Sequence, residues 1–396
     1  MRVFGSKETL GFLACLFVLF PAPSYAEPYL ALRAGEPCDA CHTNMTGGGK
    51  RTDLVAMHAR EILRYPRWLG TFFADADRFT GELHPRVSLG ADLRTSYTAL
   101  FQDEPDERGL VENNTAFRDF HESRLDVTQA TGFLELELFT DRLALYVDQR
   151  LSPTTDNREA FALLRGLPWN GFLKVGRMFL PYGLQLQDDR AFVRDGYEGV
   201  SPRTGFSFDA SQGALELGIR PGPFRFVTAV SEGRGGDRDV QWTGTGSLWL
   251  GELPWVDHAM LGGSFSLDDA GDDPTWLLGA FGGLSRGPVV LLAEVDFRSE
   301  KGETTGGGRH GTFLAYAEAN YLLFGWLNAK LAFDYADDDG DLRQRADDSE
   351  NRLSVGFEPF LSRFLQLRFF YRVGNGVRSR PEHNRDELLA EAHLFF

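Results

Sequence analysis

In the stretch "LQLRFFYRV", residues 365–373, every second residue is apolar. Leu365, Leu367, Phe369, Tyr371 and Val373 fall on one face, opposite Gln366, Arg368 and Arg372. Alternation with a period of two predicts a β-strand with one apolar and one charged face. The same pattern recurs upstream in "RVSLGADLRTSY" (86–97) and "FLELEL" (133–138).

The connections between these strands alternate in length. From about residue 85 onward the pattern predicts about sixteen strands, an even number, with short turns at one end and long loops at the other. The short connections are expected near 139–142, 168–170, 221–223, 251–255, 285–287, 323–326 and 360–362. The longer ones are expected near 100–117, 152–157, 180–203, 232–238, 268–274, 300–310, 337–348 and 374–384. This rhythm is typical of outer-membrane barrels.

The chain ends in "LLAEAHLFF" (388–396), which resembles the aromatic terminal strand by which bacterial outer-membrane barrels are recognised for assembly. Aromatic residues also cluster at strand ends, as an interfacial girdle requires: Trp169, Trp249, Trp255, Tyr321, Trp326 and Phe360. The predicted fold is therefore all-β, a porin-like transmembrane barrel of about sixteen strands over residues 84–396. It would lie in outer-membrane lipid around a lumen wide enough for water.

The third long loop, Pro181 to Arg203, occupies the place where general porins fold a loop into the pore. It carries both signs of charge, at Asp188, Asp189, Arg190, Arg194, Asp195 and Glu198. Its opening, "GRMFLPYGLQLQDD" (176–189), also looks like a stretch of phosphate-selective porins. Other loops are acidic, as in "DEPDE" at 103–107 and "DDAGDD" at 268–273.

The amino-terminal residues predict export. A basic start and an apolar run from Leu10 to Phe20 precede a small-x-small cleavage site that ends at Ala26. Residues 1–26 are therefore expected to be a signal peptide, and Cys15 is lost with them. The formal net charge of −16 argues against a nucleic-acid partner, which favours a basic surface.

The two remaining cysteines form the motif Cys38-x-x-Cys41-His42. This is the attachment signature of a c-type haem, in which two thiols bond the porphyrin and the adjacent imidazole reaches the iron. A disulfide leaves His42 unexplained, and a zinc site needs two further ligands that no other cysteine supplies. One covalent haem c is therefore the expected cofactor, held by Cys38, Cys41 and His42.

The haem segment is expected to cover residues 27–83, with some helix. Gly47-Gly48-Gly49 allows a sharp turn or a close approach of the backbone to the porphyrin. A helix is predicted from Thr52 to Arg64, and His58 lies on its apolar face. His58 is the first candidate for the sixth iron ligand. Met57, His84 and an open or water-bound position remain alternatives.

These features together resemble the fused monohaem cytochrome–porins of bacterial outer membranes, a family that includes outer-membrane iron oxidases. The resemblance rests on the signal peptide, the single Cys-x-x-Cys-His motif and the barrel that ends in phenylalanine. It implies haem attachment at Cys38 and Cys41 and ligation by His42. The sequence after the motif, "TNMTGGGKR", departs from that of the iron oxidases and leaves the iron substrate open.

Two functions are compatible with this sequence. In the first, the protein relays electrons from an extracellular small reductant, such as ferrous iron, to a periplasmic c-type cytochrome, and an Fe(II)-oxidising activity would belong to this reading. A wide barrel with acidic loops would suit a cationic donor. In the second, the protein is a diffusion porin for small polar solutes or anions, and the haem segment is a plug or sensor.

Overall fold

The computed structural model of the 396-residue chain describes most of the barrel and the segment that carries the cysteine motif. The described residues are 27–51, 81–111, 116–186, 188, 190–194, 204, 206, 211–233, 239–269, 274–301, 309–338, 349–362 and 364–396.

Sixteen antiparallel strands, β2 to β17, form one closed sheet, because the last strand pairs with β2 through partners such as Glu391 and Ser96. Closure leaves no unpaired edge, which is what the apolar interior of a bilayer requires of a β-structure. The predicted all-β barrel of about sixteen strands is confirmed. The strands are β2 (Val87–Phe101), β3 (Phe120–Phe139), β4 (Leu143–Ser152), β5 (Asp156–Leu167), β6 (Gly171–Phe179), β7 (Ser211–Ile219), β8 (Phe224–Glu232), β9 (Val240–Leu250), β10 (His258–Asp269), β11 (Thr275–Arg286), β12 (Val289–Lys301), β13 (Arg309–Phe324), β14 (Leu327–Asp337), β15 (Ser349–Pro359), β16 (Leu365–Asn375) and β17 (Asp386–Phe395).

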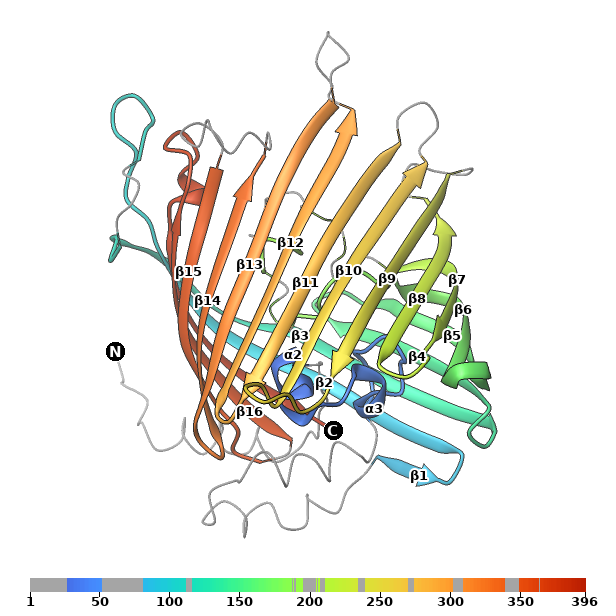
Figure 1. Ribbon diagram of the computed structural model, residues 1–396. Coiled ribbons are helices and arrows are strands. Elements are labelled where there is room, and N and C mark those ends of the chain that lie inside the picture. Colours follow the sequence, from blue (N-terminus) through green and yellow to red (C-terminus); the bar gives the residue numbers. More distant parts are fainter. Residues whose placement is uncertain are drawn as a thin grey trace.

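Short turns and long loops lie at opposite ends of the barrel, as Figure 1 shows. The turn between β3 and β4 has only residues 140–142, whereas β6 and β7 are separated by residues 180–210. A short strand, β1 (Glu82–His84), pairs with the start of β2 at the short-turn end. Two single-turn 3-10 helices, η2 (Pro168–Asn170) and η3 (Pro381–His383), lie in connections.

The strands bury their charged faces and expose their apolar faces. In β15, Arg352 is fully buried inside the barrel, while the next residue, Leu353, is 44% exposed on the outside. Lipid covers the outer face, so exposed leucine and phenylalanine are favourable there. Of the aromatic residues expected in the girdle, Trp169, Trp255 and Tyr321 are exposed at the short-turn end. Phe360 and Trp249 instead pack against apolar side chains inside the barrel, so the girdle prediction is wrong for these two.

The segment Glu27–Arg51 lies inside the barrel at the short-turn end, and we call it the luminal plug. It contains the helix α2 (Pro28–Ala34), the single turn α3 (Cys38–Cys41) and a hairpin that is closed by a bridge between His42 and Arg51. Helix α2 rests against β10, β11 and β12 (Figure 1). None of the described helices is long and apolar enough to cross a membrane.

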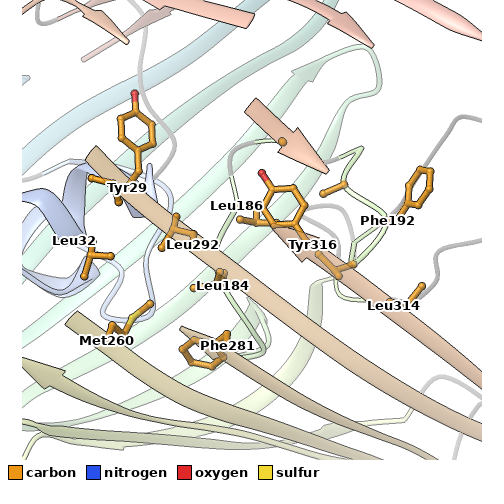
Figure 2. Close-up of a cluster of buried hydrophobic side chains, with 14 of the residues drawn as sticks. Tyr29, Leu32, Leu184, Leu186, Phe192, Met260, Phe281, Leu292, Leu314 and Tyr316 are labelled. Atoms are coloured by element: carbon orange, nitrogen blue, oxygen red, sulfur yellow. The ribbon is translucent and has the colours of Figure 1, made fainter. Parts of the chain in front are cut away.

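The loop between β6 and β7 folds into the lumen, as predicted, over its described residues. Leu184 and Phe192 from this loop share one apolar core with Tyr29 and Leu32 of the plug (Figure 2). The barrel wall completes this core with residues such as Phe281. Plug and loop therefore fill the β10–β14 side of the lumen together.

Candidate functional site

The hairpin that follows the cysteines holds His42 in one orientation. The His42 ring is 3% exposed, and its Nδ1 lies 3.3 Å from the carbonyl oxygen of Gly49. Burial lowers the pKa of His42 to about 3, with the positive charge of Arg51 contributing, so the ring is neutral at pH 7. Since a carbonyl oxygen only accepts hydrogen bonds, Nδ1 carries the proton, and the lone pair of Nε2 remains for a metal.

The glycine triplet makes this hairpin possible. Gly47, Gly48 and Gly49 all have positive φ angles, of 98°, 78° and 66°. A side chain at Gly49 would also collide with the barrel wall, because its Cβ would lie 2.1 Å from the Tyr146 hydroxyl oxygen. The left-handed backbone favours glycine at all three positions, and Gly49 needs it also because of its close approach to Tyr146.

Polar side chains of the barrel wall hold the hairpin. The hydroxyl of Thr43 donates to Glu135 of β3 at 2.9 Å. The amide of Asn44 donates to both carboxylate oxygens of Glu159 in β5, at 3.2 and 3.1 Å. All four side chains are buried, so each bond replaces water that the lumen has excluded.

Lys174 of β6 is the central cation among the wall residues that hold the hairpin. Its fully buried ammonium donates to Asn44 Oδ1 and to Thr46 Oγ1, both at 3.0 Å, and lies 3.0 Å from Glu216. Arg225 of β8 donates to the backbone carbonyl of Met45. Side chains of β3, β5, β6 and β8 therefore form hydrogen bonds with the residues immediately after the Cys-x-x-Cys-His motif.

These features fit the attachment of a c-type haem. The backbone is helical over Cys38–Cys41, which brings positions three residues apart to one side of the turn. The adjacent imidazole is neutral, and a carbonyl fixes its tautomer, which is how ligating histidines are commonly held. When bound, a haem c would supply one-electron redox chemistry.

The sixth-ligand candidates are not brought together in the described residues. His58 and Met57 lie outside those residues, as does the helix predicted from Thr52 to Arg64. His84 lies in β1 on the exposed surface, where its Nδ1 accepts a hydrogen bond from the Arg86 amide at 3.2 Å. Within the described ranges there is no group of three or more His, Cys, Asp or Glu side chains suited to a metal ion.

Each described charged side chain of the inward loop is paired with the wall. Asp188 lies 2.8 Å from Arg372 and 3.8 Å from Arg352, and these arginines hold its pKa well below the usual range. Arg190 pairs with Glu387 at 2.8 Å, and Arg194 pairs with Glu294 at 2.9 Å. Asp189, Asp195 and Glu198 lie outside the described residues. Asp188 is thus not a free negative charge at the constriction.

Beside Asp188, a cavity of about 40 Å³ opens between the loop and strands β16, β17, β2 and β3. Four arginines and two carboxylates contribute to its lining: Arg94, Arg190, Arg368, Arg372, Asp188 and Glu391. The Nε–H group of the buried Arg372 donates no hydrogen bond to any described residue. A buried donor of this kind is usually satisfied by water or an ion.

No protein family matches this sequence, and no curated protein matches it. Its fold, however, is similar to those of solved outer-membrane proteins. The loop L8 deletion mutant of OmpT from Vibrio cholerae is 12% identical, with a TM-score of 0.55 over 78% of this chain and 99% of that one. The channel DcaP of Acinetobacter baumannii is 12% identical, with a TM-score of 0.53 over 78% and 97%. An anion-selective porin from Comamonas acidovorans is 12% identical, with a TM-score of 0.54 over 78% and 99%.

The chain has the fold of a porin-like outer-membrane β-barrel. In such barrels the short turns face the periplasm and the long loops face outward. The luminal plug of this porin-like barrel therefore lies at the periplasmic end. Sequence reasoning missed its anchors, Lys174, Glu159 and Glu216. The only signal was that these charged residues occupy the inward positions of amphipathic strands, which does not reveal their partners.

Proposed function

We propose that this porin-like barrel is an electron-transfer protein, with a c-type haem attached at Cys38 and Cys41 and ligated by His42. The observation that supports this most directly is the position of the motif. The hairpin His42–Arg51 is held inside the lumen by buried contacts from Glu135, Glu159 and Lys174. A cytochrome segment that exchanged electrons only with periplasmic proteins would not need its haem-attachment motif inside the barrel lumen.

A haem at this position inside the lumen would shorten the distance that electrons must cross between the two aqueous sides of the membrane. The apolar band of such a barrel is about 25 Å tall, and the barrel wall insulates what lies inside it. A small reductant, such as ferrous iron, would enter the lumen from the long-loop end. A periplasmic c-type cytochrome would approach the plug from the short-turn end. The plug residues orient the motif and exclude water from His42, which is buried.

The test is reduction of purified, haem-loaded protein in proteoliposomes that contain a trapped soluble cytochrome c. Ferrous iron added outside is expected to produce the reduced spectrum first in the barrel protein and then in the trapped cytochrome. The Cys38→Ala/Cys41→Ala variant serves as the matched control, because its barrel lacks covalent haem. Failure of ferrous iron and other small reductants to reduce the protein, while sugars or phosphate pass, contradicts the proposal.

The second candidate, a diffusion porin for small anions, has its own support. The structural comparisons favour it over electron transfer, since the similar proteins include a channel and an anion-selective porin. The arginine-lined cavity beside Asp188 is the specific observation in this chain. In this reading the plug would need to move, because it fills part of the periplasmic end.

Conductance separates the two candidates. A diffusion porin is expected to give steady anion-selective current across a planar bilayer without any reductant. An electron-transfer protein with a fixed plug is expected to give little ionic current while it still reduces the trapped cytochrome.

A further inference from the structure

Glu27, the first residue of the luminal plug, is a buried carboxylate. Its side chain is inside the barrel and the residue is only 6% exposed. One oxygen, Oε1, accepts a hydrogen bond from the Gln366 amide of β16 at 2.6 Å. The other, Oε2, has no hydrogen-bond partner among the described residues. Burial and the neighbouring carboxylate of Glu358 raise the pKa of Glu27.

The surroundings of Glu27 contain more negative than positive charge. Lys330 of β14 lies 3.6 Å from Glu318 of β13 and 3.3 Å from Glu358 of β15. Arg368 lies 3.5 Å from Glu358, but it also donates to Glu391 at 2.9 Å. Three carboxylates, those of Glu27, Glu318 and Glu358, thus face Lys330 and Arg368, and Arg368 is shared with the carboxylate of Glu391. If all of these carboxylates are ionised, the group lacks at least one positive charge.

An uncompensated buried charge destabilises the folded protein. The sequence predicts a source of the missing charge. Cleavage of the signal peptide after Ala26 makes Glu27 the first residue of the mature chain, and its backbone nitrogen becomes an α-ammonium group. This group is generated beside the carboxylate cluster, on the residue that is already buried there.

We propose that the α-ammonium group of mature Glu27 binds within the carboxylate cluster of Glu27, Glu318 and Glu358 and fastens the plug to the wall. Signal-peptide removal would then supply a positive charge to a cluster in which carboxylates are in excess. This anchor lies at the opposite end of the plug from the Asn44–Lys174 contacts, so the plug would be held at both ends. The proposal depends on cleavage after Ala26 and not on either function of the barrel.

The first experiment uses the mature protein without any substitution. An aldehyde reagent selective for α-amino groups is applied to the folded protein and to the protein in denaturant, and labelling of Glu27 is followed by mass spectrometry. Labelling of the folded protein is expected to be at least about tenfold slower, since each pKa unit that ion pairing adds removes tenfold of the reactive neutral amine. Equal rates, or a mature chain that does not begin at Glu27, overturn the proposal.

The second experiment moves the amine away from the cluster. Insertion of Gly-Ser between Ala26 and Glu27 displaces the α-ammonium group by two residues while every side chain of the plug remains. Faster labelling and faster tryptic cleavage at Arg33 are expected. Adding Glu27→Gln to this extended protein removes the unbalanced charge and is expected to restore protection at Arg33.

Two outcomes of the second experiment contradict the proposal. If the extended protein is cleaved as slowly as its parent, the amine does not fasten the plug. If Glu27→Gln leaves the extended protein equally sensitive, the extension acts by steric displacement rather than through charge.

Discussion

The imidazole Nδ1 of His42 and the carbonyl oxygen of Gly49, seven positions further along the chain, lie 3.3 Å apart. This contact ties the orientation of the only histidine in the cysteine motif to a backbone conformation that glycine permits. Orientation of the imidazole is what a metal ligand requires from its surroundings, because the second ring nitrogen must point at the metal.

Gly49→Ala is expected to weaken haem incorporation more than Gly48→Ala. Both positions have positive φ, so alanine costs about 1–2 kcal/mol of backbone strain at either one. Only at Gly49 does the added Cβ collide with the Tyr146 hydroxyl, whereas nothing lies within 4 Å at Gly48. The measurement is haem per folded barrel, by absorbance. Equal losses in the two variants would show that the close approach to Tyr146 has no role.

Cys38→Ala/Cys41→Ala is expected to abolish covalent haem without preventing barrel assembly, because the closed strand ladder from β2 to β17 does not involve either residue. Haem staining after denaturing electrophoresis and heat-modifiable mobility report the two properties separately. A haem-stained band in the double variant would disprove covalent attachment at these residues.

Lys174→Met is expected to destabilise the protein by about 3–5 kcal/mol, since it leaves the buried Glu216 carboxylate without its cation. The double variant Lys174→Met/Glu216→Gln is expected to recover part of this loss, because the uncompensated charge is gone. Urea unfolding of the protein in detergent micelles measures both. A double variant no more stable than Lys174→Met would mean that the ion pair is not the source of the effect.

Asp188→Asn is expected to make the lumen more anion-selective, because it removes the carboxylate that pairs with Arg372 and Arg352. The reversal potential in a salt gradient measures this, and the exposed Glu104→Gln provides a control with the same change in charge. A shift of equal size in both variants would mean that Asp188 acts only through net charge. The result also bears on the cationic electron donor. The sequence suggested that Asp188 is a free carboxylate that could attract such a cation, whereas in the structure it is paired with arginine.

Labels inserted at 103–107 are expected to be accessible on intact cells, and labels at 221–223 are expected to be protected. The first site is in a long loop and the second is in the short turn between β7 and β8. Accessible short turns with protected long loops would reverse the orientation and place the plug at the outer end.

The barrel could be predicted from the sequence because the patterns that indicate it involve residues close together in the chain. Side-chain alternation along "LQLRFFYRV" depends only on the period of a strand, and strand pairing between neighbours follows from the length of each connection. Strand number, loop rhythm and the inward loop were predicted for this reason, and the Cys-x-x-Cys-His motif was visible as five consecutive residues. Trp249 and Phe360 follow the inward parity of β9 and β15, so the period itself directs both side chains into the lumen. Their assignment to the girdle rested only on their being aromatic and near strand ends.

The placement of the amino-terminal segment was decided by tertiary structure. Asn44 meets Glu159 and Lys174 across 115 and 130 residues of chain, and Glu27 meets Gln366 across 339. No periodicity encodes such contacts. They depend on which inward-facing charged residues of the closed barrel lie at the same level along its axis. They depend also on burial, because an unpaired buried charge is destabilising and a partner of opposite charge removes that cost.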